Sequence, residues 1–138
     1  MTATHTAPSP QLAETGATFL AGIKDPFDQA RLALAWAHDT FGEELVLASS
    51  MGDEVLVHLA SDVVPEVRVL FIDTGYHFAE TLGTADAYAA TRPIRLLTVA
   101  PRRTVAQQDA EEGAQLFARD PDRCCALRKV EPLERGLA

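Results

Sequence analysis

Two adjacent cysteines, Cys124 and Cys125, are the only cysteines in this sequence of 138 residues. Residues 120–122, Asp-Pro-Asp, have the composition of a helix start, with an N-cap acid followed by a first-turn proline. The thiols would then lie in the first turn of a helix, one turn ahead of Arg128 and Lys129. Backbone N–H groups and positive charge at that place favour thiolates, which attack electrophiles or bind metals.

Three interpretations of the cysteine pair remain open on the residues alone. The cysteines could be small apolar residues that pack at a helix end, as many free cysteines do. A disulfide between adjacent residues would distort the backbone, which disfavours a redox pair. A zinc or iron–sulfur site needs about four ligands, and the sequence offers two cysteines and no CxxC, so another chain would have to complete it.

The remaining elements follow from apolar spacing and from turn residues. Residues 11–23 are weakly helical, and residues 1–10 are predicted to be a disordered tail ahead of a domain spanning 11–138. Short apolar runs predict three strands, at 44–50, 67–75 and 94–99. Helical spacing predicts helices at 26–41, 55–63, 77–91 and 104–117, with a last one from 120.

Two expectations concern side-chain packing in these helices. The last helix is predicted to bury an apolar face at 3.6-residue spacing, made of Leu127, Val130, Leu133 and Leu137. Trp36, the single tryptophan, is expected to pack near the core. Thr104, with Gln107 three residues later, matches a capping box that would begin the helix predicted over 104–117.

Strands that alternate with helices predict an α/β fold with a parallel sheet flanked by helices on both faces. Ligands of such sheets bind beyond the carboxyl ends of the strands. That rule selects three loops, "SSMGDE", "DTGYHF" and "APRRT".

Composition excludes several classes of protein. The formal net charge is −8, which disfavours nucleic-acid binding through a basic face. The sequence contains no run of about 18 apolar residues, so no membrane helix is predicted. The first residues lack the pattern of a secretory signal. With two cysteines, a disulfide scaffold is not expected either, so a reducing cytoplasm is the expected compartment.

Two of the three loops carry groups suited to a ligand. In the first, Ser49, Ser50 and Gly52 would suit a phosphate or sulfate, although no Walker lysine follows. The second loop adds an acid, a hydroxyl, a glycine and an aromatic residue, with His77 close by. Each loop alone is equally typical of an ordinary capped turn, and the pair together favours a nucleotide site. Arg102 and Arg103 of the third loop are a typical solvated basic pair.

Four segments, "SSMGDE", "VLFIDTGYHFAET", "TVAQQD" and "LFARDPDRCCALRKVEPL", occur in the order seen in the adenylyl-sulfate and phosphoadenylyl-sulfate reductases of sulfate assimilation. The sequence resembles that family from about residue 27 to 138. The combination of "IDTGYHFAET" with "CCALRKVEPL" is specific, and either segment alone is not.

The resemblance implies an adenine nucleotide α-hydrolase-like (PP-loop) fold and a set of site residues. The residues from Ser49 to Asp53 resemble the phosphate loop, and Ile72, Asp73, Thr74 and Gly75 resemble the segment beside the adenosine. Cys124 and Cys125 would be two ligands of a 4Fe–4S cluster, which marks the subgroup that uses adenosine 5′-phosphosulfate (APS). Lys129 matches a lysine between cluster and sulfate, and Arg128 would assist in substrate binding.

The family reaction implied is thioredoxin-dependent reduction of APS to sulfite and AMP. It needs a downstream CxxC and a near-terminal cysteine nucleophile, and the sequence stops at Ala138 before either. We therefore expect a truncated fold with the first strand at an open edge, and association with a further copy or with a missing C-terminal part. Alternatives are the 3′-phosphorylated substrate (PAPS), a redox-inactive nucleotide-binding module, and an ATP-using PP-loop ligase or sulfurtransferase, which the cysteine pair disfavours.

Overall fold

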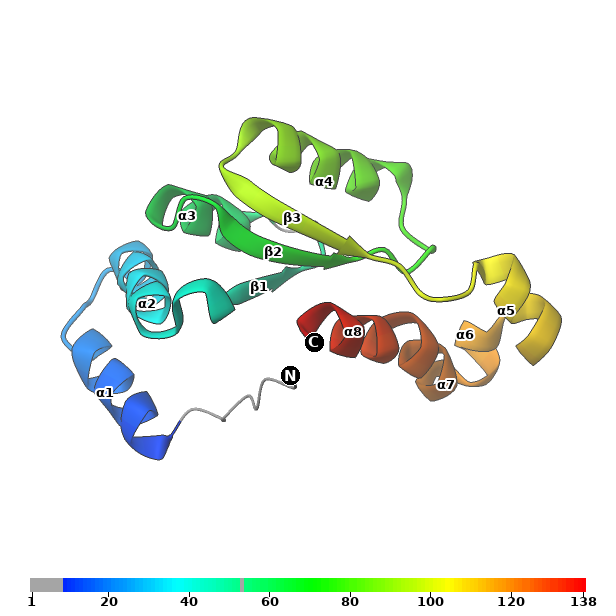
Figure 1. Ribbon diagram of the computed structural model, residues 1–138, viewed down its shortest axis with the longest axis horizontal. Coiled ribbons are helices and arrows are strands. Elements are labelled where there is room, and N and C mark those ends of the chain that lie inside the picture. The colour runs from blue at the N-terminus through cyan, green and yellow to red at the C-terminus, as the bar shows by residue number, and fades with distance from the viewer. Residues whose placement is uncertain (1–8, 53) are drawn as a thin grey trace. The chain divides into compact units, whose positions relative to one another are not determined.

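The computed structural model describes residues 9–52 and 54–138 of the chain (Figure 1). It divides into two compact units, one up to Leu45 and the other from Val46. Residues 1–8 of the predicted tail lie outside the described residues, and Ser9 and Pro10 already open a helix. The domain limits of 11–138 stay a prediction.

The first unit consists of helices α1 (Pro10–Leu20) and α2 (Pro26–Phe41), followed by the short 3₁₀ helix η1 (Gly42–Glu44). Asp25 caps α2 by accepting hydrogen bonds from two first-turn N–H groups, and Gly42 ends the helix. The two helices touch where Trp36 lies over Gly16, so closely that a Cβ on Gly16 would come within 2.9 Å of the indole ring. Trp36 thus packs between the helices of this unit, half-buried.

The second unit is built on a parallel sheet of strands β1 (Val46–Ser49), β2 (Val67–Ile72) and β3 (Ile94–Val99), in the order β1-β2-β3. Ser49 pairs with Phe71 and Phe71 with Thr98, so the three carboxyl ends meet at one edge of the sheet. The predicted α/β class and parallel sheet are confirmed. Within the described residues β1 pairs on one side only, as expected for an edge strand.

The core of this unit lies around the central strand. Val69, Leu70 and Phe71 of β2 are almost fully buried, which is the continuous apolar pattern of a strand covered on both faces. Helices α3 (Val55–Val63) and α4 (Ala79–Thr91) contact the sheet, and α8 (Glu131–Leu137) contacts β2 and β3. In Figure 1, α4 lies above the sheet and α8 below it.

The predicted helix over 104–117 is wrong in its second half. Helix α5 (Val105–Glu112) begins with the predicted capping box and ends at Glu112, and a separate short helix α6 (Leu116–Arg119) follows. Gly113 has φ +86°, a left-handed conformation that ends a helix and that favours glycine. Arg119 then donates to the backbone carbonyls of residues 112–114, which holds the turn closed.

The last helical segment has three parts, α7 (Pro121–Cys125), the π-helix η2 (Ala126–Val130) and α8. Asp120 is the N-cap as predicted, since its Oδ1 accepts from the N–H of Arg123 at 3.0 Å. A π turn contains more residues than an α turn and often marks a functional site.

The predicted apolar face of this segment is wrong in part. Val130 and Leu137 are each about half exposed, and Leu127 and Leu133 are only partly buried. The face turned inward follows a spacing of four residues instead, which the π turn produces: Cys124, Arg128, Pro132 and Gly136. Because of the π turn, Arg128 faces inward, whereas regular helical periodicity predicts that Val130 does.

No helix among residues 9–52 and 54–138 is long and apolar enough to cross a membrane.

Candidate functional site

The loop after β1 is a tight, strained turn. The Ser49 hydroxyl accepts a hydrogen bond from the N–H of Met51 at 3.0 Å. Met51 itself is buried and has φ +55°, an unfavourable conformation for a residue with a long side chain. Such strain persists only where the surroundings impose it, and it clusters at functional sites.

A pocket of about 380 Å³ opens beside this loop. Ser49 and Ser50 line it together with the apolar side chains of Val55 and Leu56, which are largely exposed. The side chain of Glu54, the N-cap residue of α3, makes no capping hydrogen bond among the described residues. Of the other predicted residues of this loop, Gly52 is exposed, and Asp53 lies outside the described residues.

The loop after β2 uses its predicted residues to hold its own shape. Asp73 accepts a hydrogen bond from the N–H of Gly75 at 3.0 Å, and Thr74 Oγ1 accepts from the N–H of Tyr76 at 3.3 Å. Ile72 ends β2 and offers its carbonyl to His77 Nε2 at 2.9 Å, so this nitrogen carries the proton. Two successive turns, each closed by a hydrogen bond from a backbone N–H to a side-chain oxygen, therefore hold the conformation of this loop.

Gly75 lets this loop approach Arg128 closely. It has φ +77°, and a Cβ there would lie 3.0 Å from Arg128 Nη2. Both the backbone conformation and the contact require glycine at this position.

The structure distinguishes the two cysteines. Cys124 is 7% exposed and Cys125 lies at the surface. Their helix turn is continuous with the π turn that carries Arg128 and Lys129, so all four residues line one pocket. Each cysteine therefore lies on the same side of the helix as the cation four residues later. Cys124 and Arg128 are buried, and Cys125 and Lys129 are exposed.

Arg128 is 3% exposed and joins three segments. Its Nε donates to the carbonyl of Thr74, and its Nη1 donates to the carbonyl of Arg103 at 3.2 Å and to Gln108 Oε1 at 3.1 Å. The Tyr76 ring lies 5.5 Å from the guanidinium carbon. Among the described residues no hydrogen-bond acceptor is found for Nη2. Arg128 therefore connects the loops after β2 and β3 with α5.

These contacts assemble a pocket of about 420 Å³ at the carboxyl edge of the sheet. Its lining residues come from the loop after β2, from α6 and from the segment of the cysteines: Thr74, Tyr76, His77, Phe117, Pro121, Cys124, Cys125, Arg128 and Lys129. The predicted site residues that meet here are Thr74, Cys124, Cys125, Arg128 and Lys129. Ser49 and Ser50 line the separate pocket after β1.

The sequence indicated an aromatic residue in the loop after β2, which is Tyr76, but it did not single out Phe117 or Gln108. Tyr76 and Phe117 stack edge to face, with ring centroids 5.7 Å apart, and form an aromatic wall of the larger pocket. They lie 41 residues apart in the chain, so spacing could not link them. Gln108 lies in a helix in which every other residue is exposed or half-buried, and its burial left no trace in the local pattern.

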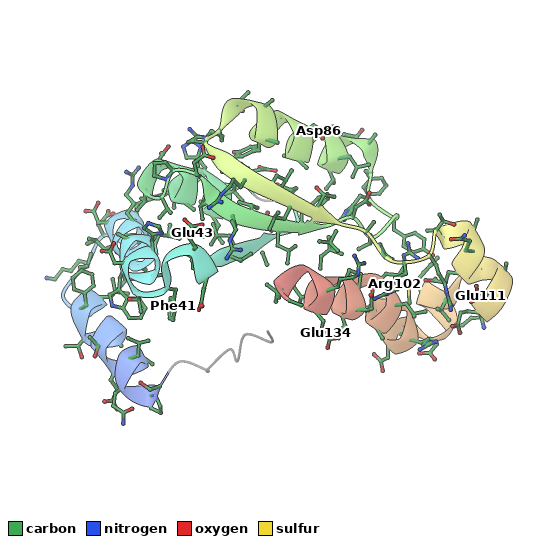
Figure 2. The ribbon with its side chains drawn as sticks, in the orientation of Figure 1. Phe41, Glu43, Asp86, Arg102, Glu111 and Glu134 are labelled. Carbon is green, nitrogen blue, oxygen red and sulfur yellow. The ribbon has the colours of Figure 1, made fainter. Side chains whose placement is uncertain are left out.

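Most cations near the pocket are already paired with carboxylates. Arg102 binds Glu131 at 2.7 Å, Arg103 binds Glu111, and Arg123 binds Glu112 at 2.9 Å (Arg102 and Glu111 are labelled in Figure 2). For Lys129 the part of the chain that the structure describes provides no carboxylate within salt-bridge distance. Lys129 is thus the cation of the pocket that is open to an anionic ligand.

Glu131 links the loop after β3 to α8. Hydrogen bonds from Arg135 and, next in size, from Arg102 hold the pKa of its carboxyl below the usual value of 4.5. Arg135 also donates to the carbonyl of Ala100. The ion pairs fix the start of α8 below the sheet, directly after the π turn.

The thiols fit half of a tetrahedral thiolate site. Both cysteines are free and line the same pocket, but a cluster or structural zinc needs about four ligands. Among the described residues no group of three or more His, Cys, Asp or Glu side chains could hold a metal ion. The described residues supply two of the thiolates that a cluster needs and do not hold one by themselves.

Comparison with known proteins gives three concordant findings. Residues 44–138 match the model of the phosphoadenosine phosphosulfate reductase domain. Proteins named adenosine 5′-phosphosulfate reductase are similar: that of Streptomyces coelicolor is 58% identical over 76% of this chain and 44% of its own length, and that of Mycobacteroides abscessus is 53% identical over 92% and 52%. The chain thus spans about half the length of the curated relatives it matches.

The fold has a solved counterpart. A crystal structure of phosphoadenylyl-sulfate reductase from Candida auris, in a phosphate complex, superposes with a TM-score of 0.71 at 23% identity and covers 94% of this chain and 63% of its own. At that identity the likeness concerns the fold alone, and it agrees with the predicted α/β fold built on a parallel sheet.

Proposed function

This chain belongs to the phosphoadenosine phosphosulfate reductase domain family, and we propose that its site binds adenosine 5′-phosphosulfate for reduction to sulfite and AMP. The observation that carries the proposal is the pocket in which Thr74 of the "IDTG" segment meets Cys125 and Lys129. Thr74 and Lys129, 55 positions apart along the chain, converge there, and Lys129 has no carboxylate partner among the described residues.

The charge of the pocket supports a sulfate group as the ligand. Lys129 is exposed into it, and Arg128 presents Nη2 while its other donors are held by the protein. Two cations beside a sulfonyl group would neutralise its oxygens, so that an anionic thiolate can approach the sulfur.

We place the 5′-phosphate at the loop from Ser49 to Asp53 and the adenosine beside Ile72, Asp73, Thr74 and Gly75. Support comes from the side-by-side carboxyl ends of β1 and β2, where Ser49 pairs with Phe71 and the "DTG" turn begins two residues later. A hydroxyl-lined, strained turn at the start of a helix suits a phosphate.

In the proposed reaction a cysteine thiolate attacks the sulfonyl sulfur, forming an S–S bond as the S–O bond to AMP breaks. One thiol of reduced thioredoxin then attacks the enzyme sulfur and displaces sulfite, and its second thiol breaks the mixed disulfide, which releases the enzyme thiol and leaves thioredoxin as a disulfide. We assign Cys124 and Cys125 to two of the four thiolate ligands of a 4Fe–4S cluster, which leaves the nucleophilic thiol unassigned in this sequence. A cytoplasmic reaction fits the two free thiols.

The proposal is tested by calorimetric titration of the purified chain with APS, AMP, ATP and PAPS. We expect APS to bind more tightly than AMP and ATP. Because one charge-assisted contact to the sulfate is lost, Lys129→Met should weaken APS binding about tenfold and AMP binding little.

The sequence offers a matched control, since Lys24 is its only other lysine and lies exposed on the first unit. Lys24→Met changes the net charge equally and should alter APS affinity less than about twofold. Equal affinity for APS and AMP, unchanged in Lys129→Met, would contradict the proposal. Preference for ATP would favour a nucleotide-activating enzyme, and tighter binding of PAPS would change the assigned substrate.

A further inference from the structure

Gln108 is the most buried polar side chain of α5. It is 1% exposed, whereas every other residue of that helix is exposed or half-buried. A buried amide costs free energy unless its hydrogen-bonding groups are satisfied, so its presence calls for a specific partner.

That partner is Arg128, and it determines how the amide is oriented. A guanidinium only donates hydrogen bonds, so the amide atom 3.1 Å from Arg128 Nη1 must be the oxygen. Gln108 Nε2 then points elsewhere, and no acceptor for it exists among the described residues. The orientation of the amide thus gives Arg128 an acceptor and leaves the amide N–H groups without one in the described part of the chain. The hydrogen bond to Arg128 therefore determines the orientation of Gln108.

Gln108 differs from the other acceptors of Arg128 in the rigidity of its support. The carbonyls of Thr74 and Arg103 belong to loops, whereas Gln108 belongs to the first turns of α5. That helix start is held by a reciprocal capping box, with Thr104 Oγ1 accepting from Gln107 N–H at 3.2 Å and Gln107 Oε1 accepting from Thr104 N–H at 2.9 Å. The amide is therefore a fixed point against which the guanidinium is oriented.

The orientation matters because only one edge of the guanidinium is left for a ligand. With Nε and Nη1 held, Nη2 is the remaining nitrogen; it lies beside Gly75, and the Arg128 side chain lines the pocket that Cys125 and Lys129 share. Rotation of the guanidinium about the side-chain bonds of Arg128 would move Nη2 away from its present position. It would also break the hydrogen bond from Nε to the carbonyl of Thr74, and this bond holds the loop after β2.

We infer that Gln108 is a positioning residue that holds Arg128 Nη2 toward the pocket and, through Arg128, holds the Thr74–Gly75 turn. Its effect on Arg128 is a property of the chain alone. Its effect on ligand affinity rests on the proposed function of the pocket.

The first experiment observes Arg128 without a ligand. The Nε–H signal of Arg128 is identified in ¹⁵N–¹H spectra of the full chain as the signal absent from Arg128→Lys, and its exchange with water is measured. We expect exchange to be at least about tenfold faster in Gln108→Met, which removes the acceptor at similar size, because each 1.4 kcal/mol of lost protection is tenfold. Gln108→Glu retains an acceptor and should stay within about twofold of wild type.

Gln107→Met is the matched control. It weakens the start of α5 without touching Arg128, and should leave the Arg128 signal unchanged. Unaltered exchange in Gln108→Met, equal acceleration in Gln107→Met, or failure of Gln108→Glu to retain protection would each overturn the inference.

The second experiment titrates the same variants with APS and AMP. We expect Gln108→Met to bind APS about tenfold more weakly than wild type, with AMP changed less and with Gln108→Glu restoring APS affinity. If the wild-type chain binds no sulfonucleotide, the proposed function fails, while the exchange measurement still decides whether Gln108 positions Arg128. If APS binds but all variants bind it equally, the positioning role in ligand binding is wrong.

Discussion

Helix α8 lies so close to the sheet that a single methyl group on Gly136 should be felt. A Cβ on this residue would lie 2.9 Å from Leu70 Cδ1 and 3.1 Å from Val99 Cγ2. Leu70 is 1% exposed and Val99 is β-branched, so neither side chain moves aside freely. Gly136→Ala is therefore an overpacking substitution on the inward face of the helical segment, the face that also carries Cys124 and Arg128.

The magnitude is a balance of two terms. Overpacking of a core by a methyl group costs about 1–3 kcal/mol. Replacing glycine by alanine in a helix returns about 0.5–1 kcal/mol, and less at the penultimate residue of α8. We expect Gly136→Ala to lower the free energy of unfolding by about 0.5–2 kcal/mol. Gly83 provides the control, because it is an exposed glycine inside α4 and a Cβ on it would have no atom within 4 Å.

Gly83→Ala should raise the free energy of unfolding by about 0.5–1 kcal/mol, because only the helix term applies there. Both variants are compared with wild type by urea unfolding followed by circular dichroism, with equal slopes required for the comparison. If Gly136→Ala stabilises the chain as much as Gly83→Ala does, α8 does not pack on the sheet as closely as described, and the reasoning fails.

Three further predictions concern the thiols, a helix cap and an ion pair. Cys125 should be alkylated by iodoacetamide much faster than the buried Cys124, as read by peptide mass spectrometry, and equal rates would contradict the difference in burial. Thr104→Ala should lower the free energy of unfolding by about 1 kcal/mol because the capping box is lost, whereas Thr104→Ser should retain most of it; identical losses would show that the cap contributes nothing. The depressed pKa of Glu131 means that its contribution to stability is present above its unfolded value near 4.5 and is lost as the pH falls through the lower folded value. Glu131→Gln should therefore weaken the acid dependence of unfolding as the pH falls below the unfolded pKa of this carboxyl, and an acid profile identical to wild type would rule this out.

Much of the fold follows from local chemistry. The helix from Pro26 to Phe41 is predicted to the residue, because Asp25 and Gly42 mark its ends. The strand at 94–99 is likewise predicted in full, and the two other strands are predicted a few residues too long. Those errors lie where a strand runs into its loop, since the polar residues after β2 form turns of their own instead of pairing.

The larger errors come from positions where long-range contacts decide. The capping box of α5 is predicted correctly, but the predicted helix extends through Gly113, whose positive φ is held by Arg119 from the next turn. Helical spacing predicts Val130 inside and does not predict Arg128 there. A π turn has no sequence signature of this kind, because it depends on which side chains find acceptors after the chain has folded.

By itself the sequence determined the elements, the parallel sheet, the loops at its carboxyl edge and the family, because capping, turn chemistry and apolar periodicity act over a few residues. Only the tertiary structure decided which predicted residues share a pocket. Arg128 finds its acceptor at Thr74, 54 residues away, and Tyr76 meets Phe117 from another element. Such contacts select one helical register among several of similar local free energy, and that selection exposes Cys125 and Lys129 while Cys124 and Arg128 are buried.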